Sequence, residues 1–348
     1  MVELWFAIVA VMLTLYVVLD GFDLGAGALH LLVARTDAER RQVLAAIGPF
    51  WDGNEVWLLA TGGALFVAFP QVLAAGLSGF YFAIFLVLWC LLLRGISIEF
   101  RSHVNDPLWR AFWDATLGLA SVLLAVFFGA ALGNLIRGLP LDERGWFGLA
   151  LFTNLTTRPP VGILDAYTVL VGVFALATLM LHGAAFLAWR TETAVQARSR
   201  TLARRLGLVL AVAWPLVTWA SVRVNPDMFR AFAARPLAWL AAAIALGGLL
   251  AVFLGLWRGR ALAAFIGSSC FIAGLLGATA VSLFPVMLRA IPDPARSITA
   301  YAAANDPAGL RVALGWWSLG FPLAILYFVV LLRLHRGRAV AAADGEGY

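Results

Sequence analysis

The sequence contains no lysine and little charge of either sign. All 25 basic residues are arginines, and charged residues make up only 13% of the 348 positions. Hydrophobic residues make up 63%, and the mean hydropathy is +0.91. A soluble domain of ordinary composition does not reach these values. The sequence therefore predicts an integral membrane protein.

Several motifs of soluble enzymes are missing as well. The sequence has no phosphate-binding glycine loop, no nucleophile elbow and no metal-ligand spacing, which argues against an ATPase, a hydrolase or a metal site in this chain. Its two cysteines, Cys90 and Cys270, lie in apolar runs, so we expect them to pack as small core residues. The arginines lie in short loops beside apolar runs, which is typical of membrane orientation and not of nucleic-acid binding.

Nine apolar segments are long enough to cross a bilayer as helices, each needing about 20 mostly apolar residues. We expect an all-α, polytopic membrane protein whose helices pack as bundles in one integral membrane domain (1-335), followed by a disordered polar tail (336-348). The first span is longer than a bilayer requires, so we expect it to tilt, break or protrude, with a break at Asp20–Gly27, where glycines weaken the helix and allow another backbone to approach closely. The expected spans are about 4–33, 47–69, 72–93, 112–136, 161–189, 206–222, 236–257, 261–288 and 312–332.

The distribution of arginines predicts the orientation, because nine spans place the two termini on opposite sides. The side with the first, third, fifth and seventh connections and the C-terminus has 16 of the 25 arginines, and the other side has nine. The positive-inside rule then places the N-terminus outside and the C-terminus in the cytoplasm. The first residues carry Glu3 and no positive segment, so we expect a retained span and not a cleaved signal.

Acidic residues well inside apolar spans are confined to the first two spans, residues 4-69. Asp20 and Asp23 lie toward the cytoplasmic end of the first span, and Asp52 and Glu55 toward the cytoplasmic end of the second. A carboxylate near a bilayer centre costs at least about 2.5 kcal/mol on insertion scales. Such residues are therefore paired, solvated or functional.

Two interpretations of these acids remain open. In the first, the carboxylates form a cluster that conducts protons or binds an ion. In the second, they cap helices or pair with Arg94 or Arg101 at the membrane interface. The histidines form no ligand set, and we expect His182, the one deep in a span, to be hydrogen-bonded within the bundle and not bound to a haem.

Several motifs resemble subunit II of the cytochrome bd family of quinol oxidases, including its cyanide-insensitive branch. The family's Asp-Gly-Phe-Asp-Leu-Gly element is similar to Asp20 to Gly25, and its Trp-Asp-Gly-Asn-Glu-Val-Trp element to Trp51 to Trp57. The resemblance continues more weakly to the last span, with a departure at Phe50, where some members have histidine. The supporting motif residues are Gly21, Phe22, Gly25, Trp51, Gly53, Asn54, Trp57, Arg94, Glu99 and Arg101.

The resemblance implies an accessory subunit of nine helices, paired with a subunit I of homologous fold that carries haem b, haem d and the quinol site. Such complexes lie in the bacterial cytoplasmic membrane, oxidise quinol and reduce oxygen to water with protons from the cytoplasm. The resemblance implies no haem or metal in this chain, and is compatible with a bound quinone or lipid and with small accessory subunits. It places Asp20 and Asp52 on the proton-uptake route, with Asp23 and Glu55 as neighbours.

Two other functions remain open on the residues alone. A secondary transporter that couples a proton or cation to a substrate could use the same acids, but it is expected to have broken helices at corresponding positions in both halves. A purely structural assembly subunit would tolerate loss of the carboxylates. The acidic elements occur only in the first half of the chain, which favours the oxidase subunit over the transporter.

Overall fold

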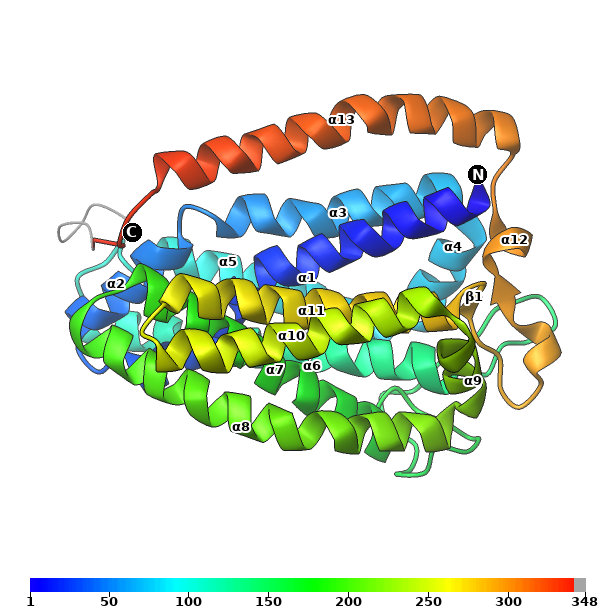
Figure 1. Cartoon of the computed structure of the whole chain (residues 1–348), viewed down its shortest axis with the longest axis horizontal. Coiled ribbons are helices and arrows are strands. Elements are labelled where there is room, and N and C mark those ends of the chain that lie inside the picture. The colour runs from blue at the N-terminus through cyan, green and yellow to red at the C-terminus, as the bar shows by residue number, and fades with distance from the viewer. Residues whose placement is uncertain (341–348) are drawn as a thin grey trace.

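The computed structural model of the chain describes residues 1–340, and most of these residues are helical. The long helices lie side by side along the long axis of the molecule (Figure 1). Strands β1 (Val286–Leu288) and β2 (Ile298–Thr299) pair antiparallel, around the 3-10 turn η1 (Pro294–Arg296). The helices are α1 (Val2–Val33), α2 (Asp37–Ile47), α3 (Trp51–Ala68), α4 (Pro70–Gly79), α5 (Tyr81–Phe100), α6 (Pro107–Arg137), α7 (Ala166–Arg190), α8 (Thr193–Val224), α9 (Pro226–Ala234), α10 (Pro236–Trp257), α11 (Ala261–Leu283), α12 (Ala300–Ala303) and α13 (Pro307–Leu334).

Eight of these helices are long and apolar enough to cross a membrane, namely α1, α5, α6, α7, α8, α10, α11 and α13. Helix α3 has 18 residues, or about 27 Å, and packs along α1 (Figure 1). Its first two turns carry the polar residues of the acidic motif. The prediction of an all-α, polytopic membrane protein is therefore confirmed, but the described residues give eight helices that meet the length and hydropathy of a span, where nine spans were expected, and α3 packs beside them.

Successive long helices alternate in direction, so the connections gather at two ends of the bundle. We call one the α2 end, which comprises residues 34–50, 101–106, 191–192, 258–260 and 335–340. The opposite end holds the N-terminus, α4, α9, β1 and α12 (Figure 1).

Several helix boundaries differ from the prediction. The expected third span, 72–93, is divided at Phe80, where the backbone leaves the helical region, and α5 then continues to Phe100. Arg94 consequently lies inside a helix and not in a loop. The basic run after the fifth span was expected to be a connection, but it forms the first turns of α8, since arginine is a good helix former. The eighth span ends at Leu283, because the chain then enters β1.

Helix α1 is continuous, so the predicted break at Asp20–Gly27 is wrong. A Cβ atom at Gly25 would lie 1.9 Å from the carbonyl oxygen of Leu179 in α7. A Cβ atom at Gly183 would lie 2.3 Å from the backbone nitrogen of Ala26. These glycines allow α1 and α7 to pack backbone to backbone, and that packing outweighs the low helix propensity of glycine.

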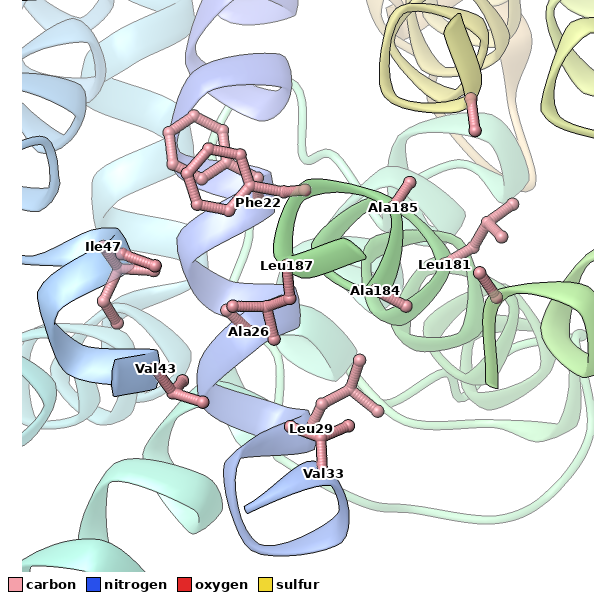
Figure 2. Close-up of a cluster of buried hydrophobic side chains, with 14 of the residues drawn as sticks. Phe22, Ala26, Leu29, Val33, Val43, Ile47, Leu181, Ala184, Ala185 and Leu187 are labelled. Carbon is pink, nitrogen blue, oxygen red and sulfur yellow. The ribbon is translucent and has the colours of Figure 1, made fainter. Parts of the chain in front are cut away.

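A buried apolar cluster joins α1, α2 and α7 near the α2 end (Figure 2). Helix α2 begins with a capping box, in which the Thr36 hydroxyl accepts from the Glu39 backbone and the Glu39 side chain accepts from the Thr36 backbone. The labelled members of the cluster are Phe22, Ala26, Leu29, Val33, Val43, Ile47, Leu181, Ala184, Ala185 and Leu187. The cluster fixes α2 and the last turns of α1 against α7.

Part of the predicted C-terminal tail is attached to the bundle. The backbone nitrogen of Ala339 donates to the carbonyl oxygen of Arg190 (2.7 Å), and Arg190 Nη1 donates to the carbonyl oxygen of Gly337 (2.5 Å). Residues 336–340 are therefore hydrogen-bonded to the bundle, whereas the sequence predicted disorder for 336–348. Residues 341–348 lie outside the described residues.

Candidate functional site

A buried arginine joins two carboxylates between α1, α3 and α5. Arg94 of α5 donates from Nη1 to Asp20 Oδ1 of α1 (2.6 Å) and from Nη2 to Glu55 Oε2 of α3 (2.9 Å). The Asp20 and Arg94 side chains are 0% and 1% exposed, whereas the Glu55 side chain is 24% exposed. One guanidinium thus connects a carboxylate in the protein interior with another that reaches the surface.

Asp23 lies one turn after Asp20 on α1 and is also buried. Its Oδ2 atom accepts a hydrogen bond from Asn54 Nδ2 of α3 (2.7 Å). The same amide nitrogen donates to the carbonyl oxygen of Leu19 (3.1 Å). Asn54 therefore holds α3 against α1 beside the acids, and the structure brings Asp20, Asp23 and Glu55 into one cluster.

Five buried polar atoms in and around this cluster have no hydrogen-bond partner among the described residues. They are Tyr16 OH, Asp20 Oδ2, Asp23 Oδ1, Trp57 Nε1 and Arg94 Nε. Buried polar groups are almost always hydrogen-bonded to protein or to ordered water. These atoms are therefore the positions in the cluster at which ordered water would form hydrogen bonds.

Asp52 is not part of the ion-paired cluster. It lies exposed on the outer face of α3, whereas Asn54 points inward and is 1% exposed. Val56 and Leu59 share the outer face with Asp52 and are 53% and 74% exposed. The charges of Asp52 and Glu55 still lie close enough to interact, as expected for residues three apart on a helix.

Other residues of the second motif position α3 against its neighbours. The Trp51 ring packs on α5, where its Cζ3 atom lies 3.0 Å from a Cβ position at Gly95. Gly53 lies against α13, with the Tyr327 hydroxyl 3.2 Å from its Cβ position. Trp57 is buried and packs against two phenylalanine rings of α13, with centroids 5.8 Å apart.

Residues next to the acids of the first motif pack against α7. The rings of Phe22 and Phe186 stack with centroids 4.1 Å apart. A Cβ atom at Gly21 would lie 2.9 Å from Leu179 Cδ2 of the same helix. Phe50, at the position where a histidine occurs in some family members, is buried, and the Arg190 guanidinium lies 5.6 Å from its ring centroid.

A second buried network lies nearer the α2 end, and sequence analysis did not identify most of it. Asp114 Oδ1 of α6 accepts hydrogen bonds from Arg101 Nε (2.5 Å) and His30 Nε2 (2.6 Å). Arg101 also donates to Asp37 Oδ1 of α2 (2.8 Å). Arg101 therefore pairs with these two carboxylates and not with the acids of the two motifs. Glu99 lies half-buried on α5, where its carbonyl oxygen accepts a hydrogen bond from His103 (2.8 Å).

Both ring nitrogens of His182 are engaged within the bundle. Nε2 donates to the carbonyl oxygen of Val18 in α1 (2.8 Å), and Nδ1 lies 2.7 Å from Ser268 Oγ in α11. The ring also stacks on Phe265. His182 does not fit an axial haem ligand, since neither nitrogen is available to iron. Over residues 1–340, no group of three or more His, Cys, Asp or Glu could hold a metal ion.

Comparison with known proteins relates the chain to one family. The family model described as cytochrome bd terminal oxidase subunit II matches residues 1–335. The chain is 31% identical to the probable cytochrome oxidase subunit 2 of Haemophilus influenzae, over 94% of this chain and 92% of the relative. It is 30% identical to the cytochrome bd-I ubiquinol oxidase subunit 2 of Escherichia coli strain K12, over 93% and 91%.

A solved structure has the same fold. The bd oxidase from Geobacillus thermodenitrificans contains a chain that superimposes with a TM-score of 0.71 at 17% identity, covering 96% of this chain and 98% of that chain. The family match extends over nearly all of the sequence, including both acidic motifs. This chain therefore belongs to the cytochrome bd terminal oxidase subunit II family.

Proposed function

We propose that this chain, as subunit II of a terminal quinol oxidase, provides a cytoplasmic proton-uptake route and stabilises a haem-bearing subunit I. The family assignment supports the oxidase role, and the buried acidic cluster supports the route. On this proposal, haem b, haem d and the quinol site belong to the partner, where oxygen is reduced. The residues of this chain hold and transfer protons and do not contact oxygen.

The main support for this proposal is the hydrogen bonding of Asp20. One of its carboxylate oxygens is fixed by Arg94, and the other is buried and makes no hydrogen bond of normal length, although the Tyr16 hydroxyl lies close enough to the carboxylate to interact with it. A carboxylate held in this way keeps its position while its free oxygen exchanges protons with ordered water. Glu55 shares the guanidinium and is partly exposed, so it connects the buried acid with the surface.

Asp52 is the proposed entrance to the route. Its charge interacts with that of Glu55, and it lies on an outer face of α3 that is otherwise apolar. Asp52 lies in the first turn of α3, where water at the α2 end solvates it, whereas Val56 and Leu59 on the same face are exposed and apolar. A partner subunit would cover this apolar surface, so we place subunit I against this face of α3.

The orientation of the bundle supports uptake from the cytoplasm. Asp52 lies in the first turn of α3, next to the α2 end. This is the end of the bundle to which most of the arginines belong, and the positive-inside rule assigns it to the cytoplasm. The entrance would then face the compartment that supplies protons for water formation.

The test is oxygen consumption by the assembled, haem-replete complex across pH. Asp52→Asn and Asp20→Asn keep the side-chain size but remove the titrating group, and each should slow turnover roughly 10²-fold if a proton transfer becomes limiting. The double variant should show less than the sum of the two effects, since both acids belong to one route. Glu143→Gln, which removes an 84% exposed carboxylate at the opposite end, is the matched control.

The outcomes separate the alternatives. Full turnover by Asp20→Asn and Asp52→Asn would contradict the route. Failure of both variants to assemble would favour a structural role for the acids. The transporter alternative loses its main structural premise, because the helix that was expected to be broken, α1, is continuous.

A further inference from the structure

Five arginines gather at the α2 end, where α8 meets the turn between α10 and α11. Arg200, Arg204 and Arg205 lie on the first turns of α8, and Arg258 and Arg260 flank Gly259 in the turn. Among the described residues, none of the five has a carboxylate within 4.0 Å. This corner of the molecule therefore carries a concentrated positive charge that the chain itself does not neutralise.

Two of these arginines make hydrogen bonds that hold neighbouring elements together. Arg204 Nη2 donates to the carbonyl oxygen of Leu256 (3.0 Å), and Arg200 Nη2 donates to that of Gly259 (3.5 Å). The Leu256 carbonyl is one of the last of α10, which have no partners within the helix and carry partial negative charge, so Arg204 satisfies it, while Arg200 reaches the turn after the helix. These contacts hold α8 beside the turn.

The other three arginines make no such structural contact. Arg205, Arg258 and Arg260 are exposed, and their side chains make no hydrogen bond with other described residues. Arg258 and Arg260 lie in one turn, and Arg205 follows Arg204, which contacts the end of α10, but on another face of α8. We call these three residues the arginine patch.

The arginine patch borders an apolar surface that faces the bilayer. Leu208 and Val209 lie one turn after Arg205 on α8 and are 62% and 53% exposed. Trp257, next to Arg258, is 77% exposed, as is typical of tryptophan at the level of lipid headgroups. The three guanidinium groups therefore lie at the boundary between hydrocarbon and water.

We propose that the arginine patch binds the phosphate of an anionic phospholipid headgroup, with the acyl chains lying along the exposed apolar face of α8. Guanidinium groups form bidentate hydrogen bonds with phosphate oxygens, and basic pockets between membrane helices bind lipids such as cardiolipin. A lipid with two phosphates engages more than one of the three arginines. Arginines that served only to orient the chain during insertion would show no preference between lipids afterwards.

The test uses the assembled complex in mixed micelles, titrated with acyl-labelled cardiolipin or with acyl-labelled phosphatidylcholine. The wild-type complex should prefer cardiolipin. Arg205→Gln/Arg258→Gln/Arg260→Gln should weaken cardiolipin binding on the order of 100-fold, at about fivefold for each arginine removed. The contacts of Arg204 with α10 and of Arg200 with the turn do not involve the substituted side chains.

The matched control, Arg144→Gln/Arg158→Gln/Arg311→Gln, removes three exposed arginines from the opposite end of the bundle. It should leave cardiolipin binding unchanged. Equal weakening in both triple variants, no weakening in the first, or equal binding of phosphatidylcholine would overturn the proposal. Displacement of cardiolipin by millimolar inorganic phosphate would assign the patch to a soluble anion and overturn the lipid assignment.

A smaller change keeps the proposal testable if the triple variant does not assemble. Arg258→Gln/Arg260→Gln is confined to the exposed turn, and it should weaken binding roughly 25-fold on the same basis. Unchanged binding in this double variant would also overturn the proposal. Neither variant touches the acidic cluster, so the result is independent of the proposed proton route.

Discussion

Asp20 and Arg94 meet across α1 and α5 at 2.6 Å, and both side chains are almost completely buried. Burial of two charges costs several kcal/mol for each ion, and the attraction between them repays this only where the geometry is good. Removal of one partner leaves an uncompensated charge in the protein interior. Substitution of one residue of the pair should therefore destabilise the protein more than substitution of both.

Arg94→Gln should be the most damaging change in the cluster. It leaves Asp20 without its charge partner and also releases Glu55, so we expect a loss of about 3–5 kcal/mol of stability. Asp20→Asn/Arg94→Gln should recover part of this loss. The measurement is the thermal unfolding midpoint and yield of the purified complex, and equal losses in the single and double variants would show that the two residues are not coupled.

The pairing of Glu39 with Arg198 should make stability depend on acidic pH. The hydrogen bond from Arg198, followed by that from the Arg35 backbone, lowers the pKa of Glu39 from 4.5 to about 2. A lowered pKa in the folded state gives stability that is present above the unfolded pKa and is lost as the pH falls toward the folded pKa. The pair connects α2 with α8.

Glu39→Gln tests this dependence directly. The difference in unfolding midpoint between wild type and variant should be constant from pH 6 to 8 and should decrease below about pH 4.5, the ordinary carboxylate range. Unfolding curves of the purified complex at several pH values provide the measurement. A difference that grows on acidification would show that Glu39 stabilises the fold in its protonated form.

Gly25→Ala should prevent normal packing of α1 on α7. The added methyl group would lie 1.9 Å from the Leu179 carbonyl oxygen, which belongs to the backbone and cannot rotate away. Overpacking of this kind costs typically 1–3 kcal/mol or more. Gly62→Ala is the control, because a Cβ atom there meets nothing within 4 Å. The yield of folded complex should fall for Gly25→Ala alone, and similar yields for both would contradict the close packing.

The orientation can be tested with two engineered cysteines after Cys90 and Cys270 have been replaced by alanine. Glu143→Cys lies in an exposed loop at the end assigned to the outside, and Arg336→Cys lies at the α2 end. A membrane-impermeant maleimide should label position 143 in intact spheroplasts and position 336 only after the membrane is opened. The reverse pattern would overturn the assignment made from the arginines.

The sequence predicted the helical class because its spans are long and apolar, and it located both acidic motifs because charges stand out in such spans. It could not distinguish between the two uses of glycine in α1. Gly25 is compatible with a break or with close packing, and only the position of Leu179 on α7 decides between them. The division at Phe80 was also not apparent, since α4 and α5 form one apolar run in the sequence.

The partners of the acids were only partly predictable. Arg94 was recognised as a candidate, and it pairs with Asp20 and Glu55. The contact of His30 with Asp114 was not predicted, because the two residues are 84 positions apart and no local spacing connects them. Helix periodicity predicts which residues share a face, but it does not predict which helices become neighbours.

The direct backbone contact of α1 with α7 at Gly25 and Gly183 gives the acidic cluster one wall that cannot move far without breaking the bundle. Helix α3 forms the opposite wall, and its contact with α13 includes the rings that pack on Trp57. A displacement of α3 would therefore break the hydrogen bonds of Asn54 with Asp23 and of Arg94 with Glu55, while Asp20 and Asp23 keep their places on α1.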